Sequence, residues 1–415
     1  MNHTLSIQFI LHKIRQLTHK AGSERYDLVS PFIMVVLALI GVCFIYSAQS
    51  YSLGGQWLTQ LFWLFIGLIV YVIASTINYK VYMEYAHVIY AVGILVLLLL
   101  WTPLGMKVYG SLRWLNFRFF SIQPTEATKI ATLILACSIL AREEIKSFSD
   151  SLKTLFKTGC VFLLPILLIF LQPDLGSTLV FPPMLFALLY VSKLSKRFFI
   201  IVFLIFLFIL GLVSWDIYGY SSFLTEHKLS ASKSAGAYEA QAILPLKDYQ
   251  RNRILSFVAP QVIDPKGTDT TWNLRQSLIA IGSGGLFGKG HNKGTQAKLG
   301  YLPQSVAPND FIFSVLAEEK GFIGALLVLT LYFLLVGNGI RIAGMARDRF
   351  GMLLAVGIST IFMVHIFVNV GMTIGIMPIT GIPLPFLSYG GSFILSCCFL
   401  QGLIQSIYRF RKDYT

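Results

Sequence analysis

Charged residues are scarce in this sequence of 415 residues: Asp, Glu, Lys and Arg make up 13% of it, whereas 55% is hydrophobic. The mean hydropathy of +0.71 is well above that of soluble globular domains, so a soluble core is excluded. Several apolar runs can cross a hydrocarbon layer of about 30 Å, which takes about 20 helical residues. An all-α polytopic membrane protein is therefore expected, because a helix satisfies its own backbone polar groups.

Three kinds of functional motif are missing. The five cysteines lie in or beside apolar runs, without the spacing of a metal site or a disulfide framework, so they are expected to be small buried side chains. The stretch "AIGSGGLFGKGHNKGTQ" lacks the GxxxxGK[ST] pattern, so it is not a P-loop, although its glycines allow close approach of the backbone to a ligand. No SxxK with partner motifs in a soluble domain is present, which excludes a transpeptidase.

Apolar runs between charge clusters predict ten spans, and this even number puts both termini on one side of the membrane. Short segments on that side carry about 18 Lys and Arg against 4 opposite, so both termini are expected in the cytoplasm and the long loop 217–309 outside. The predicted spans are 31–48, 57–76, 84–101, 124–141, 155–172, 176–192, 197–216, 310–340, 352–377 and 386–408.

The predicted organisation is one membrane domain between two cytoplasmic tails. Residues 1–30 form a basic tail whose run "LSIQFILHKIRQLTHK" has the spacing of an amphipathic helix on an anionic surface, with an unstructured tail as the alternative. The membrane domain covers 31–408 and includes the external loop, and 409–415 form the second tail.

Ionisable residues within the predicted spans are the first candidates for function, since each costs about 2.5 to 3.5 kcal/mol at a helix centre on insertion scales. Glu126 and Lys129 are three apart and share a helix face, where pairing for structural reasons alone is the alternative. His365 and Asn369 are four apart and are expected to face the bundle interior, where a satisfied buried histidine is the alternative.

Other candidates gather on the external side. Arg113 lies in the connection "MKVYGSLRWLNFRFFSIQP", and Asp174 lies in the turn "QPDLG". Asp264 lies in the loop segment "IDPKGTDTTWNLRQS". Pro265 disfavours a helical conformation at the preceding residue, so the Asp264 carboxylate is expected to be presented from an extended segment. The chain has a net charge of +14 and the loop is basic, which favours an anionic ligand at the outer leaflet; contact with lipid headgroups is the alternative.

Several motifs together resemble the SEDS family (shape, elongation, division, sporulation), the polytopic peptidoglycan glycosyltransferases of bacteria. They are "RWLNFRFFSIQPTEATKIA", "QPDLGS", "DFIFSVLAEEKGFIG", "HIFVNVGMTIG" and "MPITGIPLPFLSYGGS", in the family's order and over the whole chain. Within the family, "LKDYQRNRI" followed by "QSLIAIGSGGLFGKGHNKGTQ" is similar to the elongation, RodA-type branch.

The resemblance implies a catalytic loop between the seventh and eighth spans, lipid II as substrate and an essential aspartate, here Asp264. In polymerisation, the 4-hydroxyl of one sugar attacks the anomeric carbon of another with inversion and displaces undecaprenyl pyrophosphate. A carboxylate acting as general base is the expected aid, worth about 10² to 10⁴ in rate. Positive charge for the leaving group would come from Arg113, Lys129 and loop lysines such as Lys298, or from Mg²⁺ or Mn²⁺.

The sequence also departs from the family pattern. The DPxGxGY run is stretched to "DPKGTDTTW", which adds Asp269 and puts Trp272 at the aromatic position, and Gln304 stands where Glu is common. Asp269 is interpreted as loop solvation.

The resemblance implies a class B penicillin-binding protein and the elongation machinery as partners, in the bacterial cytoplasmic membrane. No organic cofactor and no nucleic acid are expected. A flippase for lipid-linked sugars and a noncatalytic scaffold are the competing functions, although no internal repeat supports a transporter.

Overall fold

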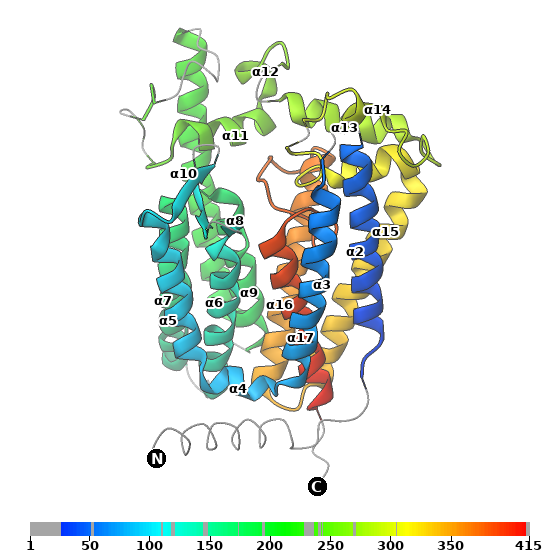
Figure 1. The fold of residues 1–415 in the computed structure, drawn as a ribbon. Coiled ribbons are helices and arrows are strands. Elements are labelled where there is room, and N and C mark those ends of the chain that lie inside the picture. Colours follow the sequence, from blue (N-terminus) through cyan, green and yellow to red (C-terminus); the bar gives the residue numbers. More distant parts are fainter. Residues whose placement is uncertain are drawn as a thin grey trace.

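Long helices packed side by side make up most of the computed structural model (Figure 1). It describes residues 26–50, 54–108, 111–117, 121–143, 148–172, 174–192, 196–227, 236–239, 242, 244–268, 271–303 and 305–411. Most of the predicted N-terminal tail, 1–25, and the last four residues lie outside the described residues.

Eight described helices are long and apolar enough to cross a membrane, and two shorter apolar segments lie between them in sequence. All ten predicted spans thus fall on apolar helices, while ten crossings with cytoplasmic termini stay a prediction. The long helices are α2 (Val29–Gln49), α3 (Gln56–Thr76), α6 (Pro124–Arg142), α7 (Phe148–Leu171), α10 (Lys196–His227), α15 (Ile312–Met345), α16 (Arg349–Thr373) and α17 (Gly391–Arg409). The shorter segments are α5 (Ala86–Leu98) with η1 (Leu99–Trp101), and α8 (Leu175–Leu179) with α9 (Phe181–Val191); α4 (Tyr79–Glu84) precedes α5.

The two ends of the described chain lie together, at the end of the bundle opposite the helices of residues 248–298 (Figure 1). The Arg409 guanidinium carbon lies 4.6 Å from the centroid of the Tyr26 ring. Asp27 accepts hydrogen bonds from Arg341 (2.6 Å) and Asn338 (2.7 Å) on α15. These contacts fix the start of α2 against α15 and α17.

Burial separates inner helices from outer ones. In α6 and α16, 83% and 72% of the most apolar window is buried, against 6% in α10. The inner helices approach closely through small residues, since a Cβ at Gly357 of α16 would lie 2.2 Å from the Leu133 side chain of α6. The polar candidates on α6 and α16 therefore lie in the interior of the bundle.

A small antiparallel sheet precedes α6, where the sequence indicated only a connection. Its strands are β1 (Gly105–Val108), β2 (Ser111–Asn116) and β3 (Ser121–Ile122), in that order. Leu115 of β2 is fully buried and pairs with Gly105 and Ile122. The all-α expectation holds for the membrane helices and needs this addition.

The seventh helix is longer than predicted, because α10 continues to His227 rather than ending at 216. Its extension carries Ile217, Tyr220 and Leu224, which form a second, small hydrophobic core with Leu255 and Ile263. The last two residues belong to α11 (Asp248–Val258) and α12 (Pro260–Ile263). We call α11, α12 and the α10 extension the external unit.

A buried arginine fixes this unit. Arg251 has no exposed surface, and its guanidinium donates to Asp216 (2.8 Å), to Asp248 (3.1 Å) and to the carbonyl of Leu244 (2.8 Å). The ring of Tyr238 lies 5.1 Å from the guanidinium carbon. The external unit is thus built around a paired charge and not around apolar side chains alone.

The rest of the loop returns to the bundle through α13 (Trp272–Gly284) and α14 (Thr295–Lys298). Buried Glu318 on α15 accepts hydrogen bonds from Lys289 (2.6 Å) and from the backbone of Thr295 (2.8 Å). A Cβ at Gly288 would lie 2.2 Å from the Glu319 carbonyl oxygen. Gly288 therefore brings the loop backbone into close contact with α15.

Between α16 and α17 the chain is not helical, so the predicted spans 352–377 and 386–408 are too long at these ends. Three prolines, Pro378, Pro383 and Pro385, lie in this segment, and proline inside a helix removes a hydrogen bond and clashes with the preceding turn. The segment is held within the protein, where Tyr332 donates to the Pro385 carbonyl (2.5 Å). Such backbone is tolerated in a membrane protein when it is buried in protein.

Candidate active site

Asp264 lies at the C-terminal end of α12 with φ −143° and ψ 72°. It is outside the helical region, as expected for a residue before proline, but its ψ is smaller than that of the predicted extended backbone. Its carboxylate is 4% exposed and accepts hydrogen bonds from the Thr268 amide (3.1 Å), the Thr271 amide (3.2 Å) and the Thr271 hydroxyl (2.7 Å). Backbone and side chain of the turn that follows thus orient the carboxylate. This is the preorganised arrangement that a catalytic carboxylate requires.

The turn after Asp264 is covered by Arg275 of α13. Gly267 has φ +68°, a left-handed conformation that favours glycine, and the Arg275 guanidinium lies over it as the movable end of a long side chain. Trp272, at the family's aromatic position, donates to the Tyr301 carbonyl (2.8 Å). Trp272 thereby ties the start of α13 to the segment that follows α14.

A second group of charges comes from three connections and α11. The Arg113 guanidinium lies 3.7 Å from the Asp174 carboxylate, joining β2 to the turn before α8. Asp310, in the turn before α15, interacts electrostatically with Arg253, Arg113 and Asp174. Burial raises the pKa of Asp310 to about 6, although both arginines act to lower it. Two cations and two carboxylates thus meet at the base of the external unit.

A third group is buried between α6 and α16. Lys129 Nζ lies 2.8 Å from the Glu126 carboxylate and 3.2 Å from His365 Nε2, while His365 Nδ1 lies 3.1 Å from the carbonyl of Pro383. A carbonyl can only accept, so Nδ1 carries the proton and Nε2 accepts from the lysine. This is a neutral imidazole with both ring nitrogens committed.

Residues 380–383, which we call the TGIP segment, link these groups. The Thr380 carbonyl accepts from Arg253 (3.2 Å), the Ile382 carbonyl from Asn369 (2.8 Å) and the Pro383 carbonyl from His365. Asn369 also donates to the Asp310 carbonyl (3.0 Å). Successive carbonyls of one short segment therefore receive side chains from α11 and from two turns of α16.

The predicted site residues fall into separate groups. Arg113 and Asp174 come together at one, and Glu126, Lys129 and His365 at another, with Asn369 one turn above His365 on α16. Lys298 ends α14 and is exposed. Asp269 and Gln304 lie outside the described residues.

Sequence reasoning missed Arg253 and Asp310 as members of the site. Both lie inside motifs that were recognised, "LKDYQRNRI" and "DFIFSVLAEEKGFIG". A charged residue in a polar loop carries no signal of its distant partners, so only the fold brings these two together.

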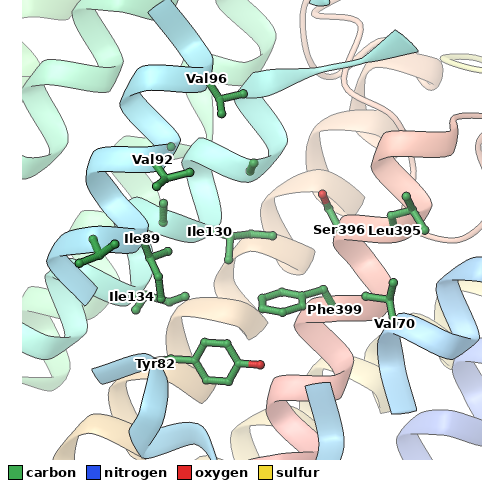
Figure 2. Close-up of a pocket in the computed structure, with 14 residues that line it drawn as sticks. Val70, Tyr82, Ile89, Val92, Val96, Ile130, Ile134, Leu395, Ser396 and Phe399 are labelled. Atoms are coloured by element: carbon green, nitrogen blue, oxygen red, sulfur yellow. The ribbon is translucent and has the colours of Figure 1, made fainter. Parts of the chain in front are cut away.

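An apolar cavity of about 490 Å³ opens among the membrane helices. Figure 2 shows Val92 and Ile89 of α5 on one side, Phe399 of α17 on the other, and Ile130 of α6 between them. Ala127 of α6 also lines it, next in sequence to Glu126. Nearly all of its lining is hydrocarbon, so it suits an apolar chain better than a sugar.

The described part of the chain contains no group of three His, Cys, Asp or Glu side chains placed to hold a metal ion. A cation of the Mg²⁺ class commonly takes one or two carboxylates and completes its shell with water and substrate phosphates. The described residues therefore fit a cation that takes one or two carboxylates from the protein and completes its shell with water and substrate phosphates.

The sequence motifs, the fold and the site together agree with one family. The family described as FTSW_RODA_SPOVE, cell cycle protein, matches residues 28–413. The chain belongs to this family. It is the SEDS family that the motifs indicated.

Curated members of the family are similar over nearly their whole length. The peptidoglycan glycosyltransferase RodA of Treponema pallidum is 32% identical, over 93% of this chain and 98% of the relative. MrdB of Escherichia coli K12, also a peptidoglycan glycosyltransferase, is 33% identical over 94% and 95%. A probable peptidoglycan glycosyltransferase FtsW of Geobacter metallireducens is 33% identical over 92% and 95%. Identity alone does not separate the two branches.

Solved structures share the fold of this family. A chain from a study of how a peptidoglycan synthase complex coordinates polymerization and crosslinking gives a TM-score of 0.73 at 24% identity, over 94% of this chain and 100% of that one. Thermus thermophilus RodA gives 0.64 at 22% identity, over 94% and 99%. These two solved structures therefore share the overall fold of this chain.

Proposed function

We propose that the protein polymerises lipid II into β-1,4 glycan strands at the outer face of the bacterial cytoplasmic membrane during elongation, releasing undecaprenyl pyrophosphate. As its family membership establishes, the chain is an enzyme of the peptidoglycan glycosyltransferase class. The single observation that carries the mechanism is the oriented carboxylate of Asp264, held by three donors at the end of α12.

Asp264 acts as the general base. It accepts the proton of the attacking 4-hydroxyl as the new bond forms at the anomeric carbon and the bond to the pyrophosphate oxygen breaks. The α-linked donor becomes a β-linked product in one displacement, so no covalent glycosyl-enzyme is needed. The donors from Thr268 and Thr271 match the ionised carboxylate, which is the form that a base requires.

Arg113 and Arg253 provide positive charge for the diphosphate. They lie in one group with Asp174 and Asp310, at the base of the unit that carries Asp264. Charge that develops on the leaving oxygen is stabilised by cations already in place, at little cost of reorganisation. Exposed Lys298 on α14 adds to the positive potential of this face.

The apolar cavity between α5, α6 and α17 takes part of the prenyl chain of the substrate or product. Its hydrocarbon lining favours an isoprenoid over any polar group. Ala127 of α6 lines this cavity, whereas Glu126, the residue before it, pairs with Lys129 in the buried polar group.

A divalent cation, Mg²⁺ or Mn²⁺, would be held by Asp264 or Asp310 together with phosphate oxygens of the substrate, and would neutralise charge on the leaving group. The partner for crosslinking is a class B penicillin-binding protein, since this chain has no transpeptidase motif set. It associates with the elongation machinery in the membrane.

Purified protein in liposomes with labelled lipid II tests the proposal. Glycan ladders are the expected product. Outward movement of lipid II without polymer would instead identify a flippase, and neither event would identify a scaffold.

A further inference from the structure

We propose that His365 is a positioning residue that acts through the TGIP segment, not a residue that binds substrate. The inference rests on the proposed function and names a further residue for that reaction. His365 is 2% exposed, and its two ring nitrogens are occupied by Lys129 and by the Pro383 carbonyl. No ring nitrogen is left to contact a substrate.

The buried pair of Glu126 and Lys129 fixes the state of His365. Glu126 and Lys129 pair at 2.8 Å within the bundle, so the lysine is a fixed donor to His365 Nε2. This contact selects the tautomer whose Nδ1 proton is aimed at Pro383. The buried ion pair thereby sets a hydrogen-bond donor beneath the TGIP segment.

The other end of the segment reaches the external unit. Three residues before Pro383, the Thr380 carbonyl accepts from Arg253 of α11. Arg253 and Asp264 belong to one small unit, because Leu255 of α11 and Ile263 of α12 share its hydrophobic core. A shift of the segment therefore shifts the unit that carries the general base.

Two substitutions separate the bonds of the imidazole. The side-chain amide nitrogen of Asn can take the place of Nδ1 and donate to Pro383, but Asn is too short to reach Lys129. The side-chain oxygen of Gln can take the place of Nε2 and accept from Lys129, with no donor for Pro383. Misplacement by about 1 Å can cost about 100-fold in rate, so a lost contact to the segment should lower kcat.

We expect His365→Gln to lower kcat for lipid II polymerisation about tenfold with KM within about twofold, and His365→Asn to keep most of kcat. In an Arg253→Met background, His365→Gln should lower kcat no further, because the contact of Arg253 with Thr380 is the link through which the segment reaches the external unit. The control is Thr360→Val on the same helix, whose hydroxyl donates to the Val356 carbonyl one turn earlier.

Hydrogen exchange of residues 374–390 and α11 provides a readout that needs no turnover. His365→Gln should speed exchange in both regions, whereas His365→Asn and Thr360→Val should not. Equal exchange in all variants, or a loss of kcat in His365→Asn with normal His365→Gln, would overturn the inference. An equal loss of kcat in both His365 variants would also overturn the inference, because it would show that His365 acts by packing alone. A wild-type protein that makes no glycan, with the expected exchange pattern, would contradict the proposed function alone.

Discussion

Arg253 on α11 donates a hydrogen bond of 3.2 Å to the carbonyl oxygen of Thr380. The donor belongs to the external unit that ends at Asp264, and the acceptor belongs to the segment that follows α16. The bond therefore joins the proposed catalytic base to the interior of the membrane bundle. The buried group of Glu126, Lys129 and His365 is thus connected to Arg253 through the backbone of the TGIP segment.

Asp310 should make stability depend on pH. Burial raises its pKa to about 6 from 3.8. A raised pKa means that the stabilising contribution of the protonated carboxyl is complete below the unfolded value and is lost as pH rises through about 6. Asp310→Asn should therefore raise Tm relative to wild type at about pH 8 and hardly at about pH 4, by thermal unfolding. A Tm difference that does not change with pH would contradict this assignment.

Arg251 should hold the external unit together. Arg251→Met leaves the buried carboxylates of Asp216 and Asp248 without their shared cation, and breaking a buried pair costs about 3 to 5 kcal/mol. We expect faster hydrogen exchange in α11 and the α10 extension, with α16 unchanged. Lys293→Met, on the exposed loop surface, is the control. Unchanged exchange in Arg251→Met would show that the unit folds on its apolar core alone.

Gly288 should be required by close packing and not only by its backbone angle. Both Gly288 (φ +78°) and Gly300 (φ +75°) adopt left-handed conformations, but only at Gly288 would a Cβ meet the backbone of α15. Gly300→Ala should cost about 1 kcal/mol from conformation, and Gly288→Ala clearly more. Thermal unfolding of the two variants separates the effects, and equal losses would rule out the packing argument.

Lys129 and Glu126 should be coupled in stability. Lys129→Met leaves buried Glu126 unpaired and should cost about 3 to 5 kcal/mol, whereas adding Glu126→Gln should recover most of that loss. Thermal unfolding of the single and double variants measures the coupling. A double variant as unstable as Lys129→Met would mean that the carboxylate is compensated by other groups.

Hydropathy and charge predicted much of the fold because they depend on local composition. Every predicted span falls on an apolar helix, and the motifs identified the family. Helix ends were less predictable: α10 continues to His227 because its extension packs on residues more than 25 positions later, such as Leu255. No window of sequence contains that contact.

Contacts between neighbours in sequence could be predicted at the candidate site, whereas contacts between distant residues could not. Spacing of three put Glu126 and Lys129 on one face, and the structure pairs them. The partners of His365 could not be predicted, because Lys129 is 236 positions away and the Pro383 carbonyl is a backbone group with no sequence signal. The interpretation of His365 as a satisfied buried histidine, left open by the sequence, describes its contacts.

The charge of Asp264 is the central claim, and Asp264→Asn is its most direct test. This variant keeps the size of the side chain and one acceptor oxygen, but it has no negative charge and cannot accept the proton of the attacking hydroxyl. With labelled lipid II in liposomes it should therefore form no glycan ladder, while expression and lipid II binding persist. Asp269→Asn, five residues later in the same loop, should retain most activity. Glycan ladders at a near-normal rate from Asp264→Asn, with none from Asp269→Asn, would contradict the account and move the base to Asp269.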